Sequence, residues 1–246
     1  MPYAYKKKVF EAVLTTKLIY GCESWFTEDY KVVEVAYMRA LRALLGVRKQ
    51  TSNQIVLTES GEPDIKDLIK KCQQKIMNSK LEDPEEPLTK VYRLCEVNNT
   101  YGFRCIEKAK NFVFDADARR QNAIVNSSKT KTITYRKINP SFAVHGMYTS
   151  SNVYIPDYRR VELTRFRVGS HRLRVETGRW SRTARELRTC SCDGIEVQDE
   201  EHVVFKCDYT RELRIKHGIE ETKTLDELLG DFNCIDFIYG VMKLFT

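Results

Sequence analysis

The sequence predicts a mainly α-helical protein, with a helical bundle at residues 1–124, a polar linker at 125–156 and a small α-rich domain at 157–246 that is stabilised by zinc. Apolar residues recur at the spacing of an amphipathic helix over most of the chain. That spacing is lost between residues 125 and 156, where serine, threonine and basic residues dominate. Three cysteines and a histidine then gather within 18 residues, which is typical of a metal-stabilised domain.

The bundle is expected to begin with two long helices. Residues 6–20 are broadly apolar, and Gly21 can end a helix there. Thr27, with two acidic residues after it, has the features of a helix N-cap. The helix that it starts carries apolar residues on one face and is expected to end at Gly46.

Three further helices complete the bundle. Pro63 suits the first turn of a helix that reaches about residue 78. Proline has no amide hydrogen, and amide hydrogens in the first turn of a helix have no partner within the helix. A shorter helix is predicted at residues 87–96 and a longer one at 101–123.

The C-terminal domain is expected to open with a helix that Asp157 caps and Gly169 ends. Short helices are predicted at residues 208–216, 224–229 and 235–244, after the cysteine cluster. The chain has no internal repeats and no heptad run long enough for a coiled coil, so the predicted class stays mainly α.

The composition is that of a globular chain. Of the 246 residues, 42% are hydrophobic and 30% are charged. The opening MPYAYKKKVFEAV lacks the apolar run and cleavage site of a secretory signal, and no stretch approaches the roughly 20 apolar residues that span a bilayer. We therefore expect an intracellular protein, nuclear or cytoplasmic, that keeps its cysteines as thiols and has no membrane partner.

The predicted zinc ligands are Cys190, Cys192, His202 and Cys207. Three thiols and an imidazole are a common ligand set for structural zinc, which takes four ligands in a tetrahedron. His202 and Cys207 would stand roughly 140° apart on an ideal α-helix, so the backbone has to enter or leave the helix between them if both bind. Four protein ligands leave no open position for catalysis. The alternative is that Cys207 belongs to a core and His202 to the surface.

Arginine is concentrated in one segment. Residues 158–188 contain ten arginines, three glutamates and no lysine, an excess that equals the net charge of +7 for the whole chain. The guanidinium group binds phosphate through two parallel hydrogen bonds and stacks on bases, whereas lysine offers a point charge. This composition favours a nucleic-acid-binding face over a merely solvated basic surface.

The residues expected to contact RNA or DNA lie within this segment. The candidates are Arg165, Arg167, His171, Arg172, Arg174, Arg179, Trp180, Arg182 and Arg185. The arginines would contact phosphates, and the two aromatic rings would stack on bases. Two alternatives stay open: Trp180 as a buried anchor, and His171 as a structural residue.

No catalytic constellation accompanies this segment. The chain has no phosphate-binding glycine-rich loop, no dinucleotide fingerprint and no serine-nucleophile elbow. The nearest motif is Phe114-Asp115-Ala116-Asp117. Its two aspartates are not adjacent, as they are in a polymerase palm, and they would face different directions on a helix. We expect a protein that is not an enzyme and has no small-molecule substrate.

Two parts of the chain resemble one family. The stretches KKKVFEAVLTTKLIYGCESW and YMRALRALLGVRK are similar to the thumb helices of non-LTR (LINE-type) retrotransposon reverse transcriptases. Further along, RFRVGSHRLRVETGRW, RTCSC and DEEHVVFKC are similar to the CCHC zinc-knuckle region at the C-terminus of the same polyproteins. Arg174 stands where the family usually has proline. The two matches occur in the family's order and cover most of the chain.

The resemblance implies the thumb and C-terminal domain of a reverse transcriptase without palm or endonuclease. The C-terminal domain would bind RNA template or target DNA, and basic residues of the thumb-like helices would grip a primer–template duplex: Lys6, Lys7, Lys8, Arg48 and Lys49. One alternative is a degenerate or domesticated remnant that is inert or binds other proteins. Another is a portion of a reverse transcriptase that acts in trans with fingers and palm made elsewhere.

Overall fold

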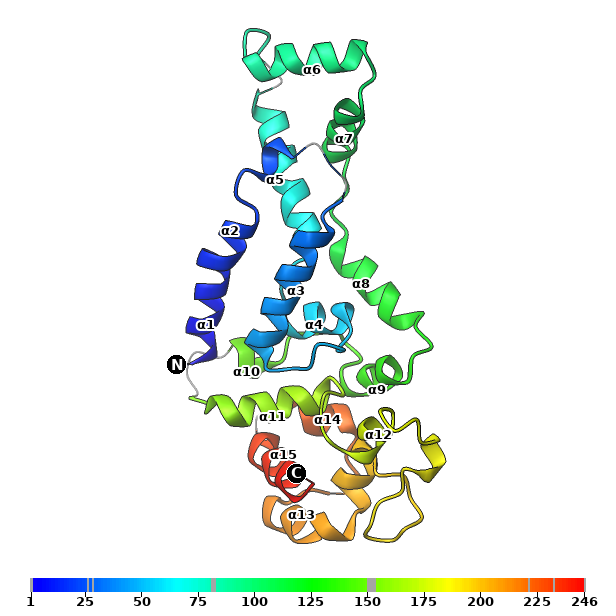
Figure 1. Cartoon of the computed structure of the whole chain (residues 1–246). Coiled ribbons are helices and arrows are strands. Elements are labelled where there is room, and N and C mark those ends of the chain that lie inside the picture. The colour runs from blue at the N-terminus through cyan, green and yellow to red at the C-terminus, as the bar shows by residue number, and fades with distance from the viewer. Residues whose placement is uncertain are drawn as a thin grey trace. The chain divides into compact units, whose positions relative to one another are not determined.

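The computed structural model describes residues 2–25, 27, 29–80, 83–149, 154–220, 222–231 and 233–245. Within these ranges the chain is mainly helical, as predicted, and contains no β-strand beyond one isolated antiparallel bridge between Thr189 and Val197 (Figure 1). None of the helices described has the length and apolar composition needed to cross a membrane. The helices form two compact units, each built from discontinuous stretches of chain.

The first of these, the α5 unit, comprises residues 7–40 and 62–120, and the second, the α11 unit, comprises residues 1–6, 41–61 and 121–246. The predicted boundaries at 124 and 157 differ from this division, because residues 41–61 and the predicted linker belong with the C-terminal part of the chain. Three helices contribute residues to both units: α1 (Tyr3–Val9), α3 (Lys31–Leu45) and α8 (Ala116–Val125).

The α5 unit is organised around α5 (Ile65–Lys80), which starts two residues after the predicted Pro63. This helix packs against α7 (Tyr101–Lys110) and against the 3-10 helix η2 (Cys22–Ser24). The buried Gln73 of α5 donates its side-chain N–H groups to two backbone oxygens in and just after that turn, each at 2.9 Å. These bonds attach the turn after the first helix to the central helix of the unit.

The predicted N-terminal helix is present, but its winding changes along its length. The α-helix α1 passes into a π-helix, η1 (Phe10–Thr15), and then into α2 (Thr16–Leu18). Gly21 follows with a φ of +68° and ends the helix region as predicted.

The helix α3 ends where it was predicted to end and begins later. The Thr27 hydroxyl accepts the Asp29 amide at 3.1 Å, and the Asp29 carboxylate accepts the first amide of the helix at 3.1 Å, so two successive side-chain turns delay its start. At the other end Gly46 has a φ of +76°, and a Cβ there would lie 2.8 Å from the Val161 side chain. Only glycine satisfies both the left-handed backbone and this close approach.

The predicted helix at residues 101–123 is two helices, α7 and α8, and the prediction of a single helix is wrong. Between them, residues 111–114 read Asn-Phe-Val-Phe, a sequence of low helix propensity. The neighbouring helix α6 (Pro87–Val97) matches its prediction and carries proline in its first turn.

The α11 unit is built around α11 (Asp157–Arg167) and α15 (Cys234–Leu244), which lie side by side (Figure 1). Arg160 of α11 is 2% exposed, and its guanidinium lies 4.7 Å from the centre of the Tyr3 ring. The same guanidinium donates to the last two backbone oxygens of α3, at 3.2 and 3.5 Å. Arg160 therefore satisfies carbonyl groups that the end of α3 leaves unpaired.

The same unit contains a helix that the sequence did not predict, α4 (Asn53–Ser60). Residues 55–60 are all buried, so the helix shows no amphipathic spacing. Glu59 is among them, and its carboxylate accepts from Nε of Arg167 at 2.6 Å and from the Tyr135 hydroxyl at 2.9 Å. Periodicity cannot detect a helix that is buried all round.

The structure corrects the predicted linker at residues 125–156. The segment includes α9 (Thr130–Ile138) and α10 (Gly146–Thr149). Tyr135 and Ile138 of α9 are 0% and 2% exposed. The segment was predicted as a linker because serine and threonine dominate its composition. Its helix α9 is held by few apolar side chains, and Tyr135 and Ile138 lie one turn apart and are buried.

The helices after the cysteine cluster follow the predictions. The 3-10 helix η5 (Asp208–Thr210) and α13 (Arg211–His217) occupy the first predicted range, and α14 (Leu225–Gly230) and α15 occupy the other two. The side chains of Thr224 and Glu227 form a capping box at the start of α14. Two short turns precede the cluster: α12 (Arg174–Thr177) and the 3-10 helix η3 (Arg185–Leu187).

Candidate functional site

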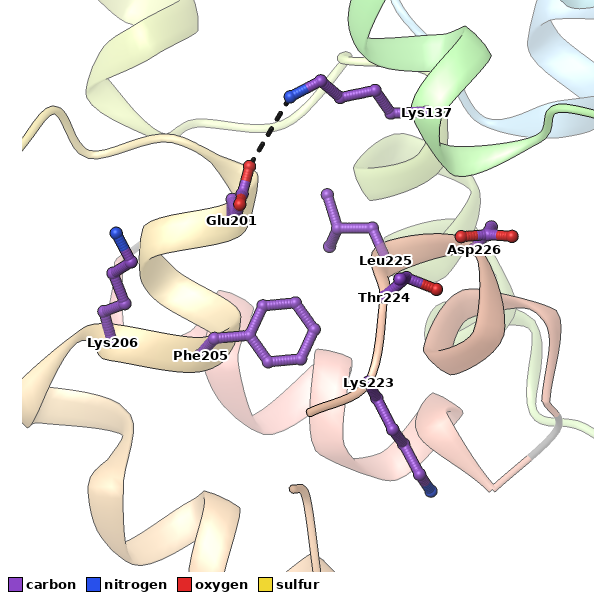
Figure 2. A pocket seen from close by; sticks show the side chains of 8 residues that line it. All are labelled: Lys137, Glu201, Phe205, Lys206, Lys223, Thr224, Leu225 and Asp226. Carbon is purple, nitrogen blue, oxygen red and sulfur yellow. Dashed lines mark ion pairs between the residues drawn. The ribbon is translucent and has the colours of Figure 1, made fainter. Parts of the chain in front are cut away.

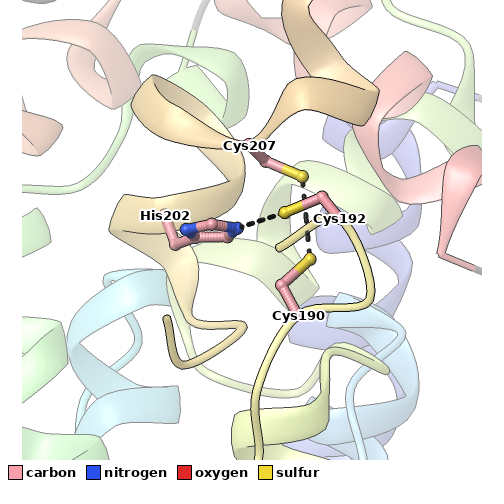
Figure 3. Close-up of side chains that lie close together, drawn as sticks. All are labelled: Cys190, Cys192, His202 and Cys207. Atoms are coloured by element: carbon pink, nitrogen blue, oxygen red, sulfur yellow. Dashed lines mark hydrogen bonds between the residues drawn. The ribbon is translucent and has the colours of Figure 1, made fainter. Parts of the chain in front are cut away.

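Cys190 and Cys192 lie on a tight loop that an antiparallel bridge closes at its base. The Cys190 amide donates to the backbone oxygen of Glu196 at 2.7 Å, so the chain returns on itself directly after the thiols. Figure 3 shows both thiols facing the side chains of His202 and Cys207. The loop thus presents two sulfur atoms to the helix that follows it.

His202 and Cys207 are brought together by a π-helix, η4 (His202–Lys206). The Cys207 amide donates to the His202 backbone oxygen at 2.8 Å, which is the i→i+5 bond of a π-turn. A π-turn places residue i+5 close to residue i, whereas an α-helix would carry it roughly 140° past. Cys207 itself has left the helix, with φ −58° and ψ +130°. The predicted exit from the helix between the two residues is confirmed.

The four side chains form one cluster. The sulfur atoms of Cys190 and Cys207 are 3.7 Å apart, and the sulfur of Cys192 is 3.2 Å from Nε2 of His202. One ligand atom from each residue lies within 4.8 Å of all the others. A disulfide needs sulfur atoms about 2.0 Å apart, so the cysteines are separate thiols. The group could hold a metal ion.

Burial and hydrogen bonds act in opposite directions on the thiols. Burial alone would raise the pKa of Cys190, but hydrogen bonds from the Cys192 amide and from Gln198 outweigh it and lower that pKa to about 7. Burial raises the pKa of Cys207 to about 12. A cation among the sulfur atoms would favour the thiolate form of each.

Glu196 orients the histidine of the cluster. Nδ1 of His202 donates to Oε2 of Glu196 at 2.9 Å, which leaves Nε2 as the lone-pair nitrogen that faces Cys192. Burial opposes protonation of the ring, but the bond to Glu196 outweighs it and raises the pKa of His202. A carboxylate behind the imidazole is the usual outer-shell partner of a metal-bound histidine.

Two of the predicted nucleic-acid contacts are buried. Arg167 is 3% exposed, pairs with Glu59 and donates to the backbone oxygen of Leu229 at 2.9 Å. His171 is 1% exposed, and its Nε2 lies 2.8 Å from a carboxylate oxygen of Glu200. Both side chains are buried and hydrogen-bonded to partners in the core, so both predicted contacts are corrected to structural residues.

Three further candidates are partly exposed and pair with acidic neighbours. The pairs are Arg165–Glu162 at 2.8 Å, Arg179–Glu176 at 3.1 Å and Arg185–Asp199 at 2.9 Å. Their arginine side chains are 40%, 32% and 41% exposed. The carboxylates of Glu162 and Asp199 are partly exposed; ion pairs at this exposure contribute about 0–1 kcal/mol, so a phosphate could compete for Arg165 and Arg185. Glu176 is only 4% exposed and also pairs with Lys131, so Arg179 is held more firmly.

The remaining candidates are exposed: Arg172, Arg174, Trp180 and Arg182. Trp180 is 64% exposed, which rules out the buried-anchor alternative. Arg174 donates to the backbone oxygen of Thr189 at 2.8 Å. Over the part of the chain that the structure describes, the guanidinium groups of Arg172 and Arg182 have no hydrogen-bond or ion-pair partner.

Arg48, one of the basic residues predicted on the thumb-like helices, joins this group. Its guanidinium carbon lies 4.4 Å from the centre of the Trp180 ring, and its amide donates to the Ser170 hydroxyl at 2.9 Å. Of the other predicted thumb contacts, Lys6 pairs with Asp157 at 2.6 Å and Lys7 pairs with Glu62 at 2.9 Å. Lys8 and Lys49 are exposed.

A cavity of about 470 Å³ lies beside η4, and Phe205 and Leu225 point into it (Figure 2). The ion pair between Lys137 and Glu201, at 3.7 Å, lies at its edge. The other charged residues that line the cavity are Lys206, Lys223 and Asp226. Because the lining carries both signs of charge, it does not select an anion or a cation.

The two aspartates of the polymerase-like motif lie at the start of a surface helix. Asp115 is exposed just before α8. Asp117, in the first turn of that helix, forms an ion pair with Arg120 one turn later. The Asp117 carboxylate therefore lies in the first turn of α8, where negative charge stabilises a helix.

Comparison with known proteins identifies no relative. No protein-family model matches the chain, and neither a curated protein nor a solved structure matches it. The resemblance to LINE-type reverse transcriptases rests on the sequence motifs alone and stays a hypothesis.

Proposed function

We propose that the α11 unit binds single-stranded nucleic acid, RNA template or target DNA, and that a structural zinc ion holds its C-terminal part in shape. The observation that carries this proposal is Trp180, which is 64% exposed and stacks against Arg48 at 4.4 Å. A large aromatic ring in water is a binding surface when basic groups surround it. Arg172, Arg174 and Arg182 are all exposed and lie within eight positions of Trp180 along the sequence.

Zinc is supported by the ligand types and by their spacing. Around a tetrahedral zinc ion with Zn–S bonds of 2.3 Å, two sulfur atoms stand about 3.8 Å apart. The sulfur atoms of Cys190 and Cys207 are 3.7 Å apart. Thiolate ligands exclude magnesium and calcium, which take oxygen ligands. Cys190, Cys192, His202 and Cys207 would fill all four positions, so the ion would join the loop to η4 without reacting.

The chemistry of the exposed groups favours a nucleic acid over other anionic partners. Arginine matches phosphate with two parallel N–H donors and also stacks on bases. An indole ring offers a flat surface on which any base can stack, with about 1–3 kcal/mol per base. Together these groups are suited to a flexible chain of phosphates and unpaired bases. The sequence contains no adjacent aspartate pair of the polymerase type, so the proposed role is binding without catalysis.

The family resemblance supports the same ligand. The motifs around Trp180 and the cysteine cluster resemble the region of LINE-type reverse transcriptases that follows the polymerase. On this basis the partner of the α11 unit would be the RNA template or the target DNA. A palm and fingers supplied by another chain would be a protein partner.

The test is fluorescence anisotropy with a labelled single-stranded RNA between 50 and 200 mM salt. Phosphate contacts make the logarithm of the affinity fall with the logarithm of the salt concentration, by about 0.7 per contact for single strands. Replacing Arg172, Arg174 and Arg182 by alanine should weaken binding and reduce the slope by about 2.

A matched control removes three positive charges elsewhere. Lys71, Lys75 and Arg93 are exposed on helices of the α5 unit. Replacing these three by alanine lowers the net charge equally and should leave the affinity and slope for single-stranded RNA nearly unchanged. Equal losses in both triple variants would show only general charge attraction, and no binding by the unmodified protein would refute the proposal.

A further inference from the structure

A second cavity in the α11 unit, of about 300 Å³, is lined by arginines from two distant parts of the chain. Its basic residues are Arg48, Arg165 and Arg172, and its acidic residue is Glu162. Ser170 and His171 form another part of the wall. We name this cavity the arginine pocket. It lies where the turn after α3 meets the turn after α11.

The walls of the arginine pocket are held in place by hydrogen bonds. Arg165 donates through Nε to the Gly46 backbone oxygen at 2.8 Å and pairs with Glu162 at 2.8 Å. The Ser170 hydroxyl accepts the Arg48 amide at 2.9 Å, which joins the two turns to each other. The pocket is therefore preorganised, and a ligand would not have to order these segments.

The arginines of the pocket are incompletely paired. Arg172 has no hydrogen-bond partner for its guanidinium among the residues described, and the guanidinium of Arg48 only stacks on Trp180. Burial, followed by the positive charge of Arg172, lowers the pKa of Arg48; the negative charge of Glu176 opposes this shift, and the positive charge of Arg165 adds to it. Like charges that face one another across a cavity are relieved by a bound anion.

Three guanidinium groups against one carboxylate leave two surplus positive charges. An internal phosphodiester carries one negative charge, whereas a terminal phosphate monoester carries about −1.5 to −2 at pH 7. A volume of about 300 Å³ is at the lower end for ligand pockets, which suits one phosphate group with its waters. The charge and the size of the pocket therefore both favour the terminal phosphate of a nucleic acid over an internal phosphodiester of a strand that runs through the pocket.

We propose that the arginine pocket binds the terminal phosphate of a single-stranded nucleic acid whose last base stacks on Trp180. Arg48 connects the two parts of this site, because it lines the pocket and lies against the Trp180 ring. The inference rests on the proposed function and adds to it a preference for phosphate-bearing ends. The proposed function alone predicts binding that does not depend on the chemistry of the end.

The test compares three RNAs of one sequence, each ten nucleotides long by design, that differ only at their ends. One carries a 5′-phosphate, one a 3′-phosphate and one a hydroxyl at both ends. Anisotropy with the full chain should show that one of the phosphate-ended RNAs binds roughly tenfold or more tightly than the hydroxyl-ended RNA, as expected for new charge-assisted hydrogen bonds. The end that gives the advantage identifies the orientation of the strand.

Single substitutions then locate the site. The measured quantity is the ratio of the affinity for the preferred phosphate-ended RNA to the affinity for the hydroxyl-ended RNA. Arg172→Ala should bring this ratio close to one. Arg172→Lys should leave an intermediate ratio, because lysine keeps the charge without the paired donors. Arg182→Ala, outside the pocket, should weaken all three RNAs by the same factor and keep the ratio. Trp180→Leu should weaken all three RNAs and keep the ratio, and Trp180→Phe should restore most of the loss because a ring remains.

Two results overturn the inference alone, and a third overturns the proposed function together with it. If the unmodified protein binds all three RNAs equally, the pocket does not recognise a phosphate end, although the proposed function stands. If Arg172→Ala keeps the full ratio while circular dichroism shows an intact fold, the phosphate is bound elsewhere. If the unmodified protein binds none of the RNAs, the proposed function fails and the inference fails with it.

Discussion

Arg167 and Glu59 form a buried ion pair in the α11 unit, with Nε of Arg167 2.6 Å from Oε1 of Glu59 and side chains 3% and 0% exposed. The Tyr135 hydroxyl donates to the other oxygen of the carboxylate at 2.9 Å. Arg167 also donates to the Leu229 backbone oxygen at 2.9 Å. Both carboxylate oxygens are thus hydrogen-bonded, and the pair joins α4 to α9, α11 and α14.

Removing the cation should be far more damaging than its charge alone would suggest. Arg167→Ala leaves the Glu59 carboxylate buried without its partner, and we expect the free energy of unfolding to fall by about 3–5 kcal/mol. Urea denaturation followed by circular dichroism measures this loss. Arg172→Ala removes the same charge from an exposed side chain and should change the free energy of unfolding by less than about 0.5 kcal/mol. Small, similar effects in both variants would contradict a structural role for the pair.

The sequence could predict helices that have one polar face and local end signals. The helix α14 has its capping box and α6 has its proline, and both were located to within a residue or two. The helices α4 and α9 lack these signals, because α4 is buried on all sides and α9 carries few apolar residues. Their positions depend on tertiary partners, which a local pattern does not contain.

The same distinction separates the two candidate sites. The cysteine cluster could be predicted because all its donors lie within 18 residues and their types are diagnostic. The arginine pocket could not, because Arg48 meets Trp180 and Ser170 only after the chain has folded. Nor could the sequence separate the buried Arg167 from the exposed Arg172, since the partner of Arg167 is the distant Glu59.

Gly46 should resist substitution for two separable reasons. Gly46→Ala strains a backbone with φ +76° and brings a Cβ to 2.8 Å from Val161, so we expect a loss of about 2–4 kcal/mol in the free energy of unfolding. Gly218→Ala has a similar φ of +60° with nothing within 4 Å, and should cost only the backbone part, about 1–2 kcal/mol. Equal losses in the two variants would show that the contact with Val161 is unimportant.

The cluster of Cys190, Cys192, His202 and Cys207 predicts the zinc content of the protein and of its variants. The purified chain should contain one zinc ion by elemental analysis, and Cys207→Ser should lose most of its zinc on dialysis against a chelator, because the loss of one of four ligands weakens binding. The loop around Cys190 should then become sensitive to limited proteolysis while the α5 unit keeps its helices. Cys95→Ser changes a half-buried thiol in α6, far from the cluster in sequence, and should retain the zinc. A Cys207→Ser protein with a full zinc content would exclude the cluster as the site.

His145 is a second buried titratable group of the α11 unit, at 5% exposed. Burial and then the positive charge of Arg167 lower its pKa to about 4, while Glu59 and Asp231 oppose this with negative charge. Nδ1 of the ring accepts the Met147 amide at 3.0 Å, which requires the nitrogen to be unprotonated. The folded protein therefore keeps this histidine neutral at pH values where an unfolded chain would protonate it.

The consequence is a loss of stability in mild acid. A histidine in the unfolded chain titrates near 6.5, so between pH 6.5 and 4 the unfolded state binds a proton that the folded state does not. Stability then falls as the pH decreases through this window. From pH 7 to pH 5 the free energy of unfolding should fall by about 2 kcal/mol more in the unmodified protein than in His145→Gln, whose amide does not titrate. Urea denaturation at both pH values measures the difference, and identical pH dependence in the two proteins would assign the acid sensitivity to other groups.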